Sequence, residues 1–150
     1  MDHIKYFEKT LKEVCRKTRT RMPAIAKDNR LGKNYVASVF SGVSIKTGKI
    51  TYFMRYNKNL INKMSKANIL HVICHEIGHV RTTTFECEHK RNKIEEEYKA
   101  ERFALRTIKK HFPKQYPHAI QYLKSFLDDY DRDETYKKMA IRVITEMEPK

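Results

Sequence analysis

The 150-residue chain has no tryptophan and only three cysteines, Cys15, Cys74 and Cys87. Their odd number and irregular spacing do not form a disulfide framework, so we expect a reducing, cytoplasmic compartment. The apolar runs are only a few residues long, which argues against a membrane-spanning helix. The N-terminal stretch also lacks the apolar core of a signal peptide. Without repeats or a linker-like segment, residues 1–150 are predicted to form a single domain.

Acidic residues are scarce relative to basic ones, and the imbalance is uneven along the chain. The net charge is +14, and residues 1–64 hold 15 Lys and Arg against 4 Asp and Glu. Such a field attracts anionic partners, so nucleic acid or an acidic protein is a possible partner of this basic N-terminal half. The alternative is a solvated face that only aids solubility. No RRM signature and no convincing helix-turn-helix pattern is present, and no feature indicates an oligomeric state.

Hydrophobic periodicity predicts an α+β fold. A first helix is expected over residues 3–21, followed by a small, mainly antiparallel sheet. Two β-branched and aromatic stretches on either side of Lys46-Thr47-Gly48-Lys49 predict its hairpin. Residues 50–56 are a candidate exposed edge strand, and edges of this kind bind peptides by strand addition. Further helices are predicted over residues 66–80, 92–111, 116–129 and 133–147, with Ser65 and Asp133 as caps.

The residues with the clearest chemistry are His75-Glu76-Ile77-Gly78-His79. Residues four apart share one face of a helix, so His75 and His79 can direct both imidazoles at one metal ion. Glu76 lies on the adjoining edge, where its carboxylate can take a proton from a water molecule without being a ligand. Zinc bound at such a site lowers the pKa of water toward neutrality. His/His/carboxylate ligation favours zinc over other divalent ions.

A catalytic zinc site needs a third protein ligand and an open fourth position. Glu97 and Glu101 share one face of the following helix, so one can bind metal while the other holds a ligand histidine. Other candidates for the third ligand are Glu96, Glu88, His89 and Cys87. Glu95 and Glu96 are otherwise expected to be solvated. Thr82 and Phe85 stand where a metzincin has Gly and His, which excludes that class.

Several neighbouring residues have expected supporting roles. His71, one helical turn before His75, is predicted to lie at the rim of the site. Gly78 costs about 1 kcal/mol relative to alanine inside a helix, so we expect a close approach of the helix that carries Glu97. Cys74 is predicted to be a core residue, and Gly42 to mark a bend or bulge. Candidates for stabilising an oxyanion are Tyr116, His118 and Tyr122.

The pair of motifs HEIGH and EYKAERFA resembles the gluzincin metallopeptidases. More narrowly, it is similar to the compact ImmA/IrrE-like peptidases and the minigluzincins. The resemblance covers residues 65–105 and does not reach residues 113–150, a C-terminal helical extension. It implies a zincin-like domain in which His75, His79 and Glu97 bind one zinc ion. Glu76 would be the general base, and Glu101 would occupy a position where the family usually has Asp or Asn.

The activity that this resemblance implies is zinc-dependent hydrolysis of peptide bonds in an intracellular protein, such as a repressor or regulator. The alternative is a catalytically silent zincin-fold module. It would contact nucleic acid or an acidic protein through the basic N-terminal half. A third possibility combines the two, as a protease recruited to nucleic acid.

Overall fold

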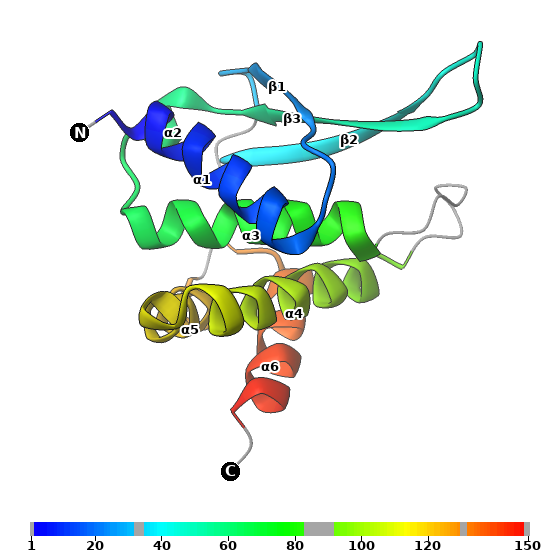
Figure 1. The fold of residues 1–150 in the computed structure, drawn as a ribbon. Coiled ribbons are helices and arrows are strands. Elements are labelled where there is room, and N and C mark those ends of the chain that lie inside the picture. Colours follow the sequence, from blue (N-terminus) through cyan, green and yellow to red (C-terminus); the bar gives the residue numbers. More distant parts are fainter. Residues whose placement is uncertain (1, 32–34, 83–91, 130–131, 149–150) are drawn as a thin grey trace.

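The computed structural model describes residues 2–31, 35–82, 92–129 and 132–148, which form helices and one small sheet (Figure 1). The predicted α+β class is confirmed, although α2 and β1 were not predicted. The elements, in chain order, are α1 (His3–Thr18), β1 (Ala24–Lys27), β2 (Ala37–Val43), β3 (Ile50–Tyr56), α2 (Lys58–Ile61), α3 (Lys66–Thr82), α4 (Lys93–His111), α5 (Tyr116–Ser125) and α6 (Glu134–Met147), with short 3-10 turns at Pro113–Gln115 and Phe126–Asp128.

The sheet has the strand order β1-β3-β2. The hairpin of β2 and β3 is antiparallel as predicted, whereas β1 pairs in parallel with β3 and makes the sheet mixed. The prediction that residues 50–56 form an exposed edge is therefore wrong, because β1 covers the second side of β3. Among the described residues, the free edge next to the helices belongs to β2. Gly42 lies in regular register with Thr51, so the expected bulge is also wrong.

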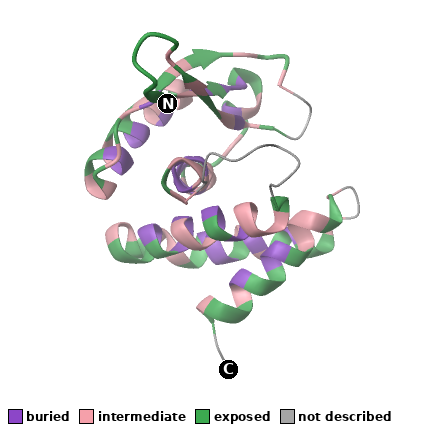
Figure 2. Ribbon diagram, turned by 90° about the vertical axis from the view of Figure 1, so that its right-hand side faces the viewer, coloured by how far each residue is buried: buried purple, intermediate pink, exposed green. Residues whose placement is uncertain are grey.

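Helix α3 lies at the centre of the molecule. Figure 2 shows it end-on, with α1 and the sheet on one side and the C-terminal helices on the other. Its buried residues include Ile69, Leu70, Ile73 and Ile77. One hydrophobic core joins these residues to side chains of α1, the sheet and α4–α6. Polar side chains on α3 are therefore enclosed by protein on two sides.

Local signals explain where the helices begin. Ser65 Oγ accepts a hydrogen bond from the backbone N–H of Asn68 at 3.1 Å, and Asp133 Oδ1 accepts one from Thr135 N–H at 2.7 Å. Both predicted caps are thus confirmed, and each satisfies a backbone donor that the first helical turn leaves free. Within the described ranges, no helix combines the length and the hydropathy that crossing a membrane requires.

Gly78 sets the distance between α3 and α4. A Cβ atom at this position would lie 2.5 Å from the carbonyl oxygen of Ala100, which is far inside van der Waals contact. The absence of a side chain lets the two backbones meet, as the sequence predicted. Ala100 and Ala104 are fully buried on the facing side of α4. This close approach brings the carboxylates of α4 within reach of the histidines of α3.

Candidate metal centre

Two antiparallel helices carry an alternating row of histidines and glutamates. His71, His75 and His79 recur every fourth residue of α3, and Glu97 and Glu101 do the same on α4. The row runs His71, Glu101, His75, Glu97, His79, and each side chain contacts the next through a nitrogen and a carboxylate oxygen. Matching four-residue spacings on facing helices are what produce this order.

Three ligand-type groups converge on one point within this row. The Nε2 atoms of His75 and His79 lie 3.1 Å apart, and the Glu97 carboxylate lies 3.0 Å from the first and 3.3 Å from the second. Tetrahedral ligands at the 2.0–2.1 Å typical of zinc would lie roughly 3.3 Å apart. Glu97 Oε2 is also buried, and among the described residues its polar contact is with His75 Nε2, whose lone pair a metal ion would share. The donor types and their spacing therefore fit a zinc ion.

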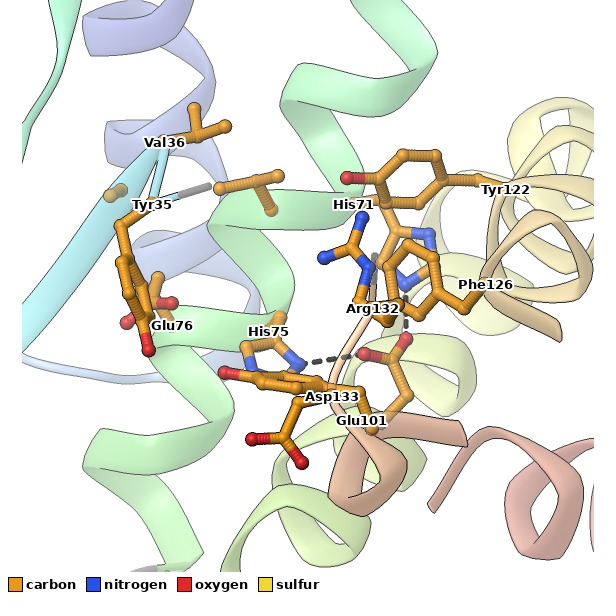
Figure 3. Close-up of a pocket in the computed structure, with 13 residues that line it drawn as sticks. Tyr35, Val36, His71, His75, Glu76, Glu101, Tyr122, Phe126, Arg132 and Asp133 are labelled. Atoms are coloured by element: carbon orange, nitrogen blue, oxygen red, sulfur yellow. Dashed lines mark hydrogen bonds and ion pairs between the residues drawn. The ribbon is translucent and has the colours of Figure 1, made fainter. Parts of the chain in front are cut away.

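Glu101 fixes the orientation of the His75 ring. His75 Nδ1 donates a hydrogen bond to Glu101 Oε2 at 2.7 Å, because a carboxylate can only accept (Figure 3). In the neutral ring this leaves the Nε2 lone pair free to bind a metal. Glu101 is 2% exposed and lies on the side of His75 away from Glu97. Its position therefore suits holding a ligand and does not suit binding the ion.

His71 does not lie at the rim of the site, so that prediction is wrong. The residue is only 1% exposed, and its Nε2 contacts the other carboxylate oxygen of Glu101. Its ring packs edge-on against Tyr122, with centroids 5.0 Å apart. His71 thus holds Glu101 through the carboxylate oxygen that His75 does not contact, and it lies at the opposite end of the row from His79.

Glu76 lies beside the convergence point and is held by the sheet. Its Oε2 accepts a hydrogen bond from the backbone N–H of Val39 at 3.0 Å. His75, Glu76 and His79 have ligand atoms within 4.8 Å of one another, so this trio is itself a possible metal-binding group. Because Val39 occupies one oxygen of Glu76, whereas Glu97 reaches both Nε2 atoms, we favour Glu97 as the third ligand.

The electrostatics of the row concentrate negative charge next to the imidazoles. Burial raises the pKa of Glu97, but hydrogen bonds and charge from His75 and His79 outweigh it and lower the pKa to about 2. Burial likewise opposes ionisation of Glu101, yet His71 and His75 lower its pKa. Burial raises the pKa of Glu76, and the two imidazoles only partly offset that rise. Glu97 thus suits cation binding, Glu101 keeps a negative charge beside His75 and His71, and Glu76 suits accepting a proton.

A cleft of about 530 Å³ runs between the free edge of β2 and this cluster. Just beyond the two ends of the β2–β3 ladder, the Val36 carbonyl accepts a hydrogen bond from Asn57 N–H, and Ser44 N–H donates one to the Lys49 carbonyl. Because hydrogen-bonded residues alternate along an antiparallel pair, the even-numbered residues of β2 bond to β3. The odd-numbered residues direct their N–H and C=O groups toward the cleft, as the bond from Val39 to Glu76 shows. The cleft is lined by Ala37, Ser38, Val39, Phe40 and Ser41 from β2, and by His75, Glu76, His79, Glu96 and Glu97 from the helices.

The sequence-based candidates for an oxyanion donor are not at the cleft. Tyr116 and His118 line neither this cleft nor the cavity that adjoins it, and Tyr122 lies beside His71 in that cavity. Tyr136 of α6 lines both hollows together with His75 and Glu76. Burial and the charges of Glu97 and Glu76 raise its pKa, so its phenol stays protonated. No local motif surrounds Tyr136, and only the docking of α6 brings it to the site.

The other residues considered for the third ligand, and their neighbours, differ in where the structure places them. Glu95 pairs with Arg142 on α6, away from the cluster. Glu96 lines the cleft, so it is not simply a solvated residue of the outer surface as the sequence predicted. Phe85, Cys87, Glu88 and His89 lie outside the described residues.

No protein-family model matches the chain, and no curated protein and no solved structure is significantly similar to it. The site itself, and the resemblance carried by its two motifs, are therefore the basis for a functional proposal.

Proposed function

We propose that this chain is a zinc-dependent metallopeptidase of the gluzincin type, with a compact zincin-like fold. The observation that carries the proposal is the convergence of His75 Nε2, His79 Nε2 and the Glu97 carboxylate at 3.0–3.3 Å. Glu76 stands beside that point with its carboxylate anchored by Val39. Two imidazoles, one carboxylate and an adjacent unligated glutamate are the set that zinc-assisted hydrolysis requires.

Each residue has a defined part in the proposed reaction. His75, His79 and Glu97 would hold a zinc ion, which would supply the Lewis acidity needed to polarise a carbonyl and acidify water. Glu76 accepts the proton of the attacking water and later passes it to the leaving amine, for which its raised pKa is suited. Glu101 holds His75 in the tautomer that presents Nε2. Tyr136 donates a hydrogen bond to the oxygen of the cleaved carbonyl as charge develops there.

The substrate class follows from the free edge of β2. Odd-numbered residues of β2 direct backbone donors and acceptors into the cleft, next to Glu76. An extended polypeptide can add to such an edge as a further strand, which places one of its peptide bonds at the cluster. Backbone pairing of this kind favours a flexible segment of a protein or a peptide over a compact small molecule.

The test of the proposed function compares Glu76→Gln with the native protein. Both are loaded with one equivalent of zinc and incubated with unstructured peptides and denatured proteins. We expect native protein to cleave, chelator to abolish cleavage, and Glu76→Gln to bind zinc equally well while losing at least about 100-fold in rate. Glu13→Gln on α1 is the matched control and should cleave normally. Cleavage that survives in Glu76→Gln, or no zinc-dependent cleavage by the native protein, would contradict the proposal.

A second candidate function, binding of an anionic partner, is favoured by a separate groove. This hollow of about 670 Å³ lies between the C-terminal end of α1 and α4. Only two of its cations come from the basic N-terminal half, and four lie along one side of α4. The groove is lined by Lys17, Arg19, Lys99, Arg102, Arg106 and Lys110, with Thr18, Thr82, Thr107, Phe103 and His111 between them.

The lining of the groove favours a nucleic-acid backbone over an acidic protein. Hydroxyls and cations are typical phosphate contacts, whereas a protein interface has an apolar core. Among the described residues that line the groove, Phe103 is the one large apolar side chain. Arg102 and Arg106 share one carboxylate, Glu146. For Lys99 and Lys110, the described part of the chain shows no acidic partner. We expect sequence-independent, salt-sensitive binding.

This second function is tested by fluorescence anisotropy with a mixed-sequence oligonucleotide over a range of salt concentrations. Lys99→Glu with Lys110→Glu should weaken binding and reduce the slope of log K against log salt by about 1.8 for two lost phosphate contacts. Lys46→Glu with Lys49→Glu, in the exposed turn of the hairpin, carries the same change of charge and should bind as the native protein does. If both pairs of substitutions weakened oligonucleotide binding equally, the groove would not be the binding site.

A further inference from the structure

A cavity of about 260 Å³ opens from the cleft beside His75 and Glu76. It is smaller than the roughly 300–1,000 Å³ of pockets that hold whole small molecules, so it fits one side chain or one chain end. The cavity and the cleft share Tyr35, Ala37 and Tyr136, which lie at the end of the cleft where β2 begins. A polypeptide bound along β2 would therefore direct a group into this cavity next to the cleaved bond.

The inner part of the cavity combines aromatic walls with one cation. Tyr122 and Phe126 form the walls, and the Arg132 guanidinium lies among them (Figure 3). The carbon of the guanidinium is 4.1 Å from the Phe126 ring centroid, which is within the range of a cation–π contact. The Arg132 side chain is 25% exposed, so its charge is only partly hydrated.

The hydrogen-bonding capacity of Arg132 is largely unused by the described residues. Its Nε is buried without a hydrogen bond and lies 3.5 Å from Asp129 Oδ2. No acceptor contacts its two Nη atoms within the ranges that the structure describes. The three acidic groups that line the cavity have partners of their own: Glu76 accepts from Val39 N–H, Glu101 lies between His71 and His75, and Asp133 caps α6.

We infer that this cavity selects a substrate carboxylate and that Arg132 is the residue that recognises it. The inference rests on the proposed peptidase function and specifies its substrate. The ligand is either an Asp or Glu side chain next to the cleaved bond or the carboxylate at the end of the substrate chain. A guanidinium presents paired donors that match the two oxygens of a carboxylate, and the aromatic walls strengthen that pairing by excluding water. A neutral amide leaves the cation unpaired, and a lysine is repelled.

Cleavage assays on matched peptides give the first test. Peptides that differ only by Glu, Gln or Lys at each position flanking the cleaved bond test the side-chain source. Peptides that differ only by a free or amidated C-terminus test the chain-end source. We expect native kcat/KM to favour the carboxylate member of one pair by about 10-fold or more. Arg132→Gln should remove that preference, and Arg132→Glu should transfer it to the Lys peptide.

Two further variants guard against a purely structural effect. Arg132→Lys keeps the charge but loses the planar pair of donors, so it should keep part of the preference. Arg21→Gln is an exposed control with the same change of charge, and it should keep all of it. Thermal unfolding of each variant shows whether the fold persists. Native protein that cleaves all members of each pair equally would overturn the inference while leaving the peptidase proposal in place.

A binding measurement separates failure of this inference from failure of the proposed function. Zinc-loaded Glu76→Gln is titrated with the same peptide pairs, because binding requires no turnover. Tighter binding of the carboxylate peptide, lost in Glu76→Gln with Arg132→Gln, supports the cavity even where no peptide is cleaved. Equal binding of all members of each pair overturns it.

Discussion

The Nδ1 atom of His75 lies 2.7 Å from Glu101 Oε2, while the Nε2 atom of the same ring lies 3.0 Å from Glu97 Oε2. One imidazole is thus held between two carboxylates that belong to successive turns of α4. Glu101 can accept the proton on Nδ1. Glu97 lies at the Nε2 side of the ring, which faces His79. This arrangement supports the proposal that Glu97 is the metal ligand and that Glu101 orients His75.

The first prediction is a ranking of zinc affinities measured by competition with a chromophoric chelator. Glu101→Gln should weaken zinc binding by about 10–100-fold, because the hydrogen bond that orients His75 becomes neutral. Glu97→Gln should weaken it further, because a charged ligand is lost. Glu95→Gln, on the same helix but paired with Arg142, should bind zinc as the native protein does. A larger loss in Glu101→Gln than in Glu97→Gln would exchange the two roles.

A second prediction concerns the contact between α3 and α4. Alanine at Gly78 would gain about 1 kcal/mol of helix propensity, but its Cβ would clash with backbone atoms of Ala100. Overpacking of this kind costs about 1–3 kcal/mol, so after the gain in helix propensity we expect a net loss of stability of up to about 2 kcal/mol in urea unfolding. Gly42→Ala is the control, since its nearest neighbour would lie 3.8 Å away. A stabilised Gly78→Ala protein would show that the helices are not in close contact.

The third prediction separates Tyr136 from the tyrosines that the sequence suggested. Tyr136→Phe removes a donor at the cleft and should lower kcat by about 100-fold with little change in KM. Tyr116→Phe removes a hydroxyl that lies outside the cleft and should leave both constants unchanged. Steady-state assays with one peptide substrate measure both. An unchanged kcat in Tyr136→Phe would mean that this phenol does not contact the developing charge.

Thiol reactivity gives a fourth prediction. Burial raises the pKa of Cys15 to about 11, and burial together with the charge of Glu101 raises the pKa of Cys74 still further. Only the thiolate is nucleophilic, so neither residue should react appreciably with iodoacetamide at pH 8 in the folded protein. Peptide mass mapping should show both residues alkylated only after unfolding in guanidinium chloride. Rapid labelling of Cys74 in native protein would contradict the buried position of α3.

Local patterns were sufficient to predict most of the helices, the hairpin and the chemistry of α3. The caps at Ser65 and Asp133 were correctly placed because capping depends on residues only two or three positions apart. The four-residue spacing of His75 and His79 likewise predicts a shared helix face without knowledge of the fold. The close approach at Gly78 was also predictable, because a glycine in an apolar helix needs a packing reason.

Features that depend on pairing between distant segments were missed. β1 has only four residues, and its parallel pairing with β3 leaves no periodic signal in the sequence. Without β1, the sequence pattern predicts β3 as an edge strand, whereas β3 is the central strand of the sheet. His71 was placed at the rim because its burial depends on how α5 packs against α3. Tyr136 and Arg132 reach the site only through the docking of the C-terminal segment, which the resemblance does not cover.

We propose that His75, His79 and Glu97 hold one zinc ion and leave a position open for water. Zinc X-ray absorption spectroscopy on the native protein loaded with one equivalent tests it most directly. We expect two imidazoles, one carboxylate and at least one additional oxygen ligand, with one carboxylate fewer in Glu97→Gln and no change in Glu76→Gln. Four protein ligands with no open position, or a spectrum that changes with Glu76→Gln and not with Glu97→Gln, would contradict it.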